Sequence, residues 1–194
     1  MRTLAADESA LAAAAEILNR GGVAVIPTDT VYGLAAHPGF PAAVERLYTI
    51  KQRAAKKPIA LLAADADAIR RFGCELPAAA DALAAAHWPG ALTLVLPRRD
   101  GAGAEGFRVP AHEWTRRLLA ACGGVLRVTS ANMSGRRPAT DAGAALGEVG
   151  LSADLVIDGG VSSGGVASTV VAFEDGRAKV LRAGPIAIAT EEMK

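Results

Sequence analysis

The chain has 194 residues, a formal net charge of +1, and 51% hydrophobic but only 4% aromatic residues. This length fits a single domain over 1–194 with a full hydrophobic core. The balanced charge excludes a protein that attracts polyanions through its overall field, so any anion site has to be local. Cys74 and Cys122 form no CxxC pair, and with only three histidines the chain is predicted to hold neither a metal site nor a disulfide framework.

The hydrophobic pattern in the first half of the chain predicts alternating helices and strands. Leu11, Ala14 and Leu18 share one face of a helix over 8–20, which Gly21 and Gly22 end. The further elements are a strand over 23–26, a helix over 41–51, a strand over 59–63, short helices over 66–72 and 77–87, and a strand over 92–96.

In the second half, a glycine-rich loop over 99–106 precedes a strand over 107–109 and a helix over 113–122. The remaining strands are predicted over 125–129, 155–157, 169–173 and 179–181. Because the later strands follow one another without helices, we expect an α/β fold with a mixed sheet. With neither a secretory signal nor an apolar run of about 18 residues, we expect a cytoplasmic protein that does not bind membranes.

The first candidate site follows the strand over 23–26. Thr28, Asp29, Thr30 and Tyr32 bring hydroxyl groups and a carboxylate together. Asp and Thr often cap turns, so this cluster alone fits a simple turn. Its position at the carboxyl end of an early strand favours a ligand pocket instead. The roles of Thr28 and Asp29 are left open.

A basic segment begins at Lys51 and contains Arg53, Lys56 and Lys57 before Pro58. It fits a solvated helix end about as well as a phosphate site, because Lys and Arg favour C-terminal turns. In an extended segment, however, Lys51 and Arg53 would share a face, and Pro58 disfavours helix just before it. We therefore expect an extended Lys-x-Arg pair that suits a polyphosphate.

The strand over 125–129 also ends in polar groups, within the segment Thr129-Ser-Ala-Asn-Met-Ser-Gly135. A polar loop with a Ser-Gly turn is the plain alternative. Ser130 and Asn132 are two residues apart, like Lys51 and Arg53. Because two predicted strands, over 23–26 and 125–129, both end in small polar residues, a pocket formed by both strand ends is favoured.

Three arginines stand in apolar strand sequences: Arg108, Arg127 and Arg182. Arginine is rarely buried unless paired, so each is a structural ion pair, a surface side chain or a cation aimed into an anion-binding cleft. We expect the last role for Arg108 and Arg182 and assign none to Arg127. The chain has no nucleophile triad, Walker motif or dinucleotide-binding glycine pattern. Hydroxyls, an amide and cations remain, which suit nucleotidyl or phosphoryl transfer.

Seven segments, in order, resemble the YrdC/TsaC family of L-threonylcarbamoyladenylate synthases. They are PTDTVYGL, KQR with a following lysine, WPGALT, FRVP, TSANMSG, ASTVV and VLRAG, between about Val23 and Gly184. The resemblance, to the short single-domain form, implies a twisted mixed sheet flanked by helices around a concave basic cleft. It also implies that L-threonine, bicarbonate (or CO2) and ATP with Mg²⁺ give L-threonylcarbamoyladenylate and pyrophosphate. Downstream proteins would then transfer the threonylcarbamoyl group to adenosine 37 of tRNA, as the t6A modification.

The resemblance also implies roles for the matched residues. Those for threonine are Thr30, Arg108 and Ser168; those for ATP are Arg53, Lys57, Asn132, Thr140 and Arg182; and Lys51 and Ser130 complete the catalytic pairs with Arg53 and Asn132. Ala54, Leu62, Ala91 and Ala104 depart from residues found in the family, and their effect is left open.

A catalytically inactive, RNA-binding relative is the alternative function. A longer carbamoyl-transfer enzyme that contains this domain is a second one, disfavoured by the chain length and the lack of zinc-type cysteines. Because the chain keeps both the Lys-x-Arg and the Ser-x-Asn pair, we expect the synthase. Weak direct binding of tRNA is left open.

Overall fold

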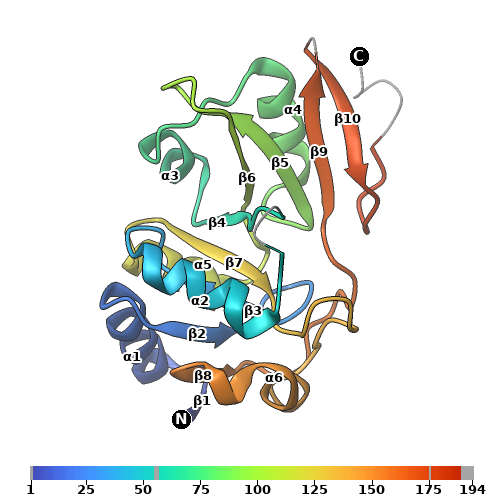
Figure 1. Ribbon diagram of the computed structural model, residues 1–194. Helices are drawn as coiled ribbons and strands as arrows, with labels where there is room; N and C mark the ends of the chain where they lie inside the picture. Colours follow the sequence, from blue (N-terminus) through green and yellow to red (C-terminus); the bar gives the residue numbers. More distant parts are fainter. Residues whose placement is uncertain (1, 55–56, 175, 189–194) are drawn as a thin grey trace.

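The computed structural model describes residues 2–54, 57–174 and 176–188, so Lys56 of the basic segment lies outside the described residues. The strands are β1 (Arg2–Ala5), β2 (Val23–Ile26), β3 (Gly33–Ala36), β4 (Leu61–Ala63), β5 (Leu92–Pro97), β6 (Ala104–Arg108), β7 (Val125–Ser130), β8 (Leu155–Asp158), β9 (Thr169–Glu174) and β10 (Arg177–Arg182). They form one 10-stranded sheet in the order β1-β8-β2-β3-β7-β4-β6-β5-β9-β10 (Figure 1).

Parallel and antiparallel pairs are combined in this sheet. Strand β2 runs parallel to β8 but antiparallel to β3, and β5 runs parallel to β9 but antiparallel to β6. The mixed sheet expected from the sequence is therefore confirmed. Figure 1 shows how strongly the sheet twists, because β2 and β9 run in nearly perpendicular directions in that view.

Helices flank the sheet along its length. They are α1 (Glu8–Asn19), α2 (Pro41–Lys51), α3 (Ala66–Arg71), α4 (Ala78–His87), α5 (Glu113–Ala121) and α6 (Ala142–Glu148), with a 3-10 turn, η1, at Gly150–Ser152. Asp7, Asp65 and Asp141 cap α1, α3 and α6, since each carboxylate accepts a hydrogen bond from a main-chain N–H of the first turn. None of the described helices is long and apolar enough to cross a bilayer.

Alternating side chains of β2 separate two hydrophobic clusters. Val23 and Val25 face the cluster under α2 and α6, whereas Ala24 and Ile26 face the cluster under α1 and α5. Because successive strand residues point to opposite faces, these two helix pairs cover opposite sides of the sheet. All four β2 residues are fully buried, so this strand is a rigid base for the polar segment that follows it.

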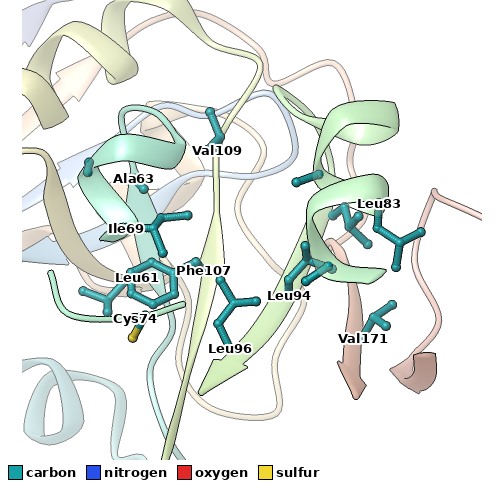
Figure 2. Packing of buried hydrophobic residues seen from close by; sticks show 14 of the residues in the cluster. Leu61, Ala63, Ile69, Cys74, Leu83, Leu94, Leu96, Phe107, Val109 and Val171 are labelled. Carbon is teal, nitrogen blue, oxygen red and sulfur yellow. The ribbon is translucent and has the colours of Figure 1, made fainter. Parts of the chain in front are cut away.

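A third cluster fills the other half of the molecule, between β4, β5, β6 and the helices α3 and α4. Phe107, Leu94 and Leu96 project from the strands toward Ile69 of α3 and Leu83 of α4 (Figure 2). Phe72 and Phe107 meet edge to face, with ring centroids 5.7 Å apart. This packing fixes β6, whose last residue is Arg108.

The sequence pattern did not predict four of the described elements: β1, β3, α6 and the short η1. In addition, residues 104–106, expected in a loop, belong to β6. Strand β3 has the sequence GLAA, whose small residues carry no strand signal of their own. It exists because pairing with β2 and β7 satisfies its main-chain groups on both sides.

Candidate functional site

The register of three neighbouring strands brings the two polar segments together. Gly33 of β3 pairs with Ile26 of β2 on one side and with Ser130 of β7 on the other. A Cβ atom on Gly33 would lie only 2.5 Å from the Val128 side chain, so the close approach requires glycine. Ala131 N then donates to the Tyr32 carbonyl at 2.8 Å, so the segments after β2 and β7 lie side by side.

A cavity of about 360 Å³ opens beside these segments. Six of the residues with a predicted binding or catalytic role line it: Thr30, Arg53, Arg108, Ser130, Ser168 and Arg182. They come from the polar loop after β2, the basic segment after α2, β6, β7, the residue before β9 and the end of β10. Lys51, Lys57, Asn132 and Thr140 are not among the residues that line it. Glu105 adds one carboxylate to the three lining arginines.

Arg108 is the most enclosed cation of the cavity, with 6% of its surface exposed. Its Nε donates to the Gly90 carbonyl at 2.9 Å, its Nη1 donates to Thr30 Oγ1 at 2.7 Å, and its Nη2 is paired with the Asp29 carboxylate. Burial lowers the pKa of Arg108, and the negative charge of Asp29 opposes this shift. Asp29 therefore has the structural task of holding the Arg108 guanidinium, a task that the sequence left open.

A second polar group joins β5, the start of β9 and the end of β10. Thr93 Oγ1 lies 2.8 Å from Ser168 Oγ, and both side chains are buried. Arg182 Nη2 donates to the Ser168 carbonyl at 2.7 Å and to Ser168 Oγ at 3.2 Å. The sequence did not identify Thr93, although it ends the WPGALT segment; the strand register that pairs it with Val170 brings it next to Ser168.

Arg53 also lines the cavity and is held by main-chain carbonyls rather than by a carboxylate. Its Nε donates to the Lys57 carbonyl and its Nη2 to the Pro58 carbonyl, both at 3.0 Å. These two bonds leave Arg53 Nη1 without a hydrogen bond to any described residue. The guanidinium is thus oriented while its charge stays uncompensated by an ion pair within the described chain.

The expectation of an extended Lys-x-Arg pair is wrong. Lys51 is the last residue of α2, and Gln52 adopts the left-handed conformation that ends the helix, with φ 49°. This turn sends the two side chains to different places. Lys51 is 1% exposed, and its Nζ donates to the main-chain carbonyls of Ser130 and Asn132. Burial lowers the pKa of Lys51 to about 8.

The remaining candidates lie outside the cavity lining. Asn132 Nδ2 donates to the carbonyls of Met133 and Arg136, at 2.9 and 2.8 Å, and so shapes its own loop. Thr140 lines a separate hollow beside α6, and Lys57 is exposed. Their contacts with ATP stay predictions.

Arg127, to which the sequence assigned no role, is a structural cation. It forms two bonds with the Glu105 carboxylate, at 2.7 and 2.6 Å, and donates to the Ile59 carbonyl at 2.8 Å. Glu105 is therefore already neutralised. The sequence could not reveal this pair, because β4 stands between β7 and β6 in the sheet.

The cavity offers no built site for Mg²⁺. The described residues contain no group of three or more His, Cys, Asp or Glu side chains that could hold a metal ion. The two nearby carboxylates, Asp29 and Glu105, are each occupied by an arginine. A Mg²⁺ ion would have to enter with the phosphates of a nucleotide, as this ion commonly does.

Comparison with known proteins shows the family and the fold of the chain. The family model Sua5/YciO/YrdC, described as "Telomere recombination", matches residues 16–184. A protein of Pyrococcus abyssi named threonylcarbamoyl-AMP synthase is 33% identical over 179 residues, which cover 88% of this chain and 53% of that protein. A protein of Bacillus subtilis with the same name is 33% identical over 192 residues, which cover 94% of this chain and 56% of that protein. The chain thus spans about half the length of these two relatives.

The fold has also been observed with a bound amino acid. The crystal structure of Pyrococcus abyssi Sua5 complexed with L-threonine superposes with a TM-score of 0.90 at 30% identity, covering 97% of this chain and 59% of that chain. The sheet and helices described above are therefore those of an experimentally known architecture.

Proposed function

Because the chain belongs to the Sua5/YciO/YrdC family, we propose that it is a threonylcarbamoyl-AMP synthase. It would combine L-threonine, bicarbonate (or CO2) and ATP into L-threonylcarbamoyladenylate and release pyrophosphate. The names of the relatives and the L-threonine complex of Sua5 support this proposal. So does one observation of the molecule itself: a single cavity is lined both by the Arg108–Thr30 group and by Arg53 and Arg182.

In this proposal the Arg108–Thr30 group binds threonine. Arg108 uses three of its N–H groups on Gly90, Thr30 and Asp29, and a guanidinium has five. The remaining N–H groups suit the α-carboxylate of an amino acid. The Thr93–Ser168 hydroxyl pair lies on the same cavity and offers partners for the side-chain hydroxyl of threonine.

Arg53 and Arg182 would bind the nucleotide. Both line the cavity, and neither has a carboxylate partner among its bonds within the described chain. Burial lowers the pKa of Arg182, and the nearby positive charge of Arg53 lowers it further, so the two cations repel each other. A triphosphate would relieve this repulsion, and Mg²⁺ bound to it would supply further charge neutralisation.

The reaction needs positioning rather than a covalent enzyme intermediate. A carboxylate oxygen of the carbamate formed on the threonine amine attacks the α-phosphorus and forms a P–O bond, while the bond to the β,γ-diphosphate breaks and the pyrophosphate leaves with its electron pair. Arginines oriented by main-chain carbonyls cost little reorganisation during this step. Ser130 lines the cavity, whereas Lys51 and Asn132 would act through the loop that they hold.

The deciding experiment is an assay with purified protein, ATP-Mg²⁺, bicarbonate and labelled L-threonine. We expect release of pyrophosphate that depends on both threonine and bicarbonate, together with a labelled adenylate. An RNA-binding relative without synthase activity would instead bind tRNA and release no pyrophosphate. Cytoplasmic location, weak tRNA binding and delivery of the product to downstream t6A-transfer proteins complete the proposal.

A further inference from the structure

Lys51 lies behind the wall of the proposed active site rather than in its lining. It is 1% exposed, and its Nζ donates to the main-chain carbonyls of Ser130 and Asn132. Ser130 lines the cavity, whereas Lys51 does not. Neither bond involves a carboxylate, so Lys51 is a buried cation without an ion pair among the described residues. A buried group of this kind is costly as long as it stays charged.

The surroundings of Nζ accept both protonation states of Lys51. A neutral amine has two N–H donors, which match the two carbonyls, and an ammonium group adds a third. The acceptors near this third donor are Ser130 Oγ and Asn132 Oδ1, both 3.5 Å from Nζ. The loop after β7 therefore keeps its two carbonyl bonds in either state, and the nearby charges decide which state prevails.

Two charged side chains act on Lys51 among the described residues. Burial and the positive charge of Arg53 lower the pKa of Lys51 to about 8, against the opposing effect of Glu148 of α6. About half of the Lys51 side chains are therefore neutral at pH 8. Arg53 lines the cavity and has no carboxylate partner among its bonds within the described chain. An anion that binds to Arg53 therefore reverses the sign of the charge near Lys51.

We propose that Lys51 takes up a proton when a polyphosphate binds at Arg53, and that the resulting ammonium group is a counter-charge behind Ser130. This inference rests on the proposed function, in which Arg53 binds the nucleotide. Negative charge favours the charged form of a nearby lysine, and salt screens this effect little because Nζ is buried. Lys51 is then a positioning residue, which acts on the nucleotide through the strand end at Ser130 and not by contact.

The test measures the protons taken up when ATP-Mg²⁺ binds at pH 8, by calorimetric titration in two buffers of different ionisation heat. The phosphates of Mg²⁺-bound ATP are already ionised at this pH, so the protons go to the protein. We expect the wild type to take up at most about half a proton per nucleotide, which is the neutral fraction of Lys51.

The affinity for ATP should also depend on pH. It should fall by at most about tenfold between pH 7 and pH 9, because the protonated fraction of Lys51 falls as the pH rises through 8. Lys51→Met should show neither the proton uptake nor this fall. Lys57→Met is the matched control, because it removes an exposed lysine of the same segment and should keep the proton uptake.

Equal proton uptake in the wild type and in Lys51→Met would overturn the inference, and so would an affinity for ATP that does not change between pH 7 and pH 9. If Lys51→Met does not fold, Glu148→Gln provides the test. It removes the charge that favours the ammonium group but keeps an oxygen acceptor for Met133 N, now 3.1 Å from the carboxylate. The pH of greatest proton uptake should move down in this variant, and an unchanged pH would contradict the inference. A wild-type protein that does not bind ATP would contradict the proposed function itself.

Discussion

Lys51 Nζ donates a hydrogen bond to the main-chain carbonyl of Asn132, so the end of α2 is tied to the segment that follows β7. A second bond reaches the carbonyl of Ser130. The lysine expected to touch a phosphate thus bonds to the polar loop. Besides burial, the positive charge of Arg53 lowers the pKa of Lys51, whereas the negative charge of Glu148 raises it.

This buried ammonium group predicts an unusual dependence of stability on pH. The pKa of Lys51 is about 8 in the folded protein, below its ordinary value of 10.5. Between these two values the unfolded chain binds more protons, so the free energy of unfolding rises with pH, by at most about 1.4 kcal/mol per pH unit. Urea denaturation of the wild type and of Lys51→Met at pH 7.5 and pH 10 should show this rise in the wild type relative to the variant. An equal change of the free energy of unfolding in both proteins would contradict a lowered pKa of Lys51.

Arg53→Ala should abolish turnover while the fold stays intact. The change removes one charge-assisted phosphate contact, worth about 1.5–3 kcal/mol in binding, from a step driven by electrostatics. Pyrophosphate release measures the activity, and the melting temperature reports on the fold. Arg99→Ala is the matched control, because Arg99 is exposed and lies outside the cavity lining. Near wild-type kinetics in Arg53→Ala would show that the phosphate site is elsewhere.

Thr93→Val should weaken threonine binding about three- to tenfold, because it removes the partner that orients the Ser168 hydroxyl at 2.8 Å. The KM for ATP should change little, since Arg182 is bound mainly to the Ser168 carbonyl. Steady-state kinetics with each substrate varied in turn separates the two effects. An equal rise of both KM values would assign Thr93 to the packing of β5 rather than to the threonine site.

Arg127→Met should destabilise the protein by about 1–3 kcal/mol, because it leaves the partly buried Glu105 carboxylate without its cation. Adding Glu105→Gln to this variant should recover part of the loss, since the uncompensated charge is then gone. Denaturant titrations of the two single variants and the double variant measure the coupling. Strictly additive losses would show that the two side chains do not interact.

Local sequence patterns predicted most of the elements and the edge of the sheet that carries the site. The strand ends predicted at Ile26 and Thr129 can be recognised in the sequence, because apolar runs stop there at polar residues. Strand β3 could not be predicted from the sequence, since Gly33–Ala36 owes its structure to pairing with β2 and β7. The prediction that Lys51 contacts the ligand failed for a similar reason. The left-handed turn at Gln52 directs Lys51 to buried main-chain carbonyls of a loop that is distant in the sequence.

The carboxylate partners of Arg108 and Arg127 could not be predicted from the sequence either. The spacing of Arg108 and Asp29, or of Arg127 and Glu105, contains no sign of their contact, which depends on the strand order. Motif resemblance supplied six of the residues that line the cavity, but not Thr93 or Glu105. Only the structure distinguished predicted site residues that line the cavity from residues such as Lys51 and Asn132, which hold the neighbouring loop.

The position of Arg182 on the outermost strand has a consequence for motion. Strand β10 pairs only with β9 within the described sheet, whereas Thr30 and Ser130 stand beside central strands. Edge ribbons open more readily than central strands. The amide hydrogens of β10 should therefore exchange with solvent faster than those of β2 and β3. A nucleotide held by Arg182 would slow this exchange, so isotope labelling would follow the filling of the site residue by residue.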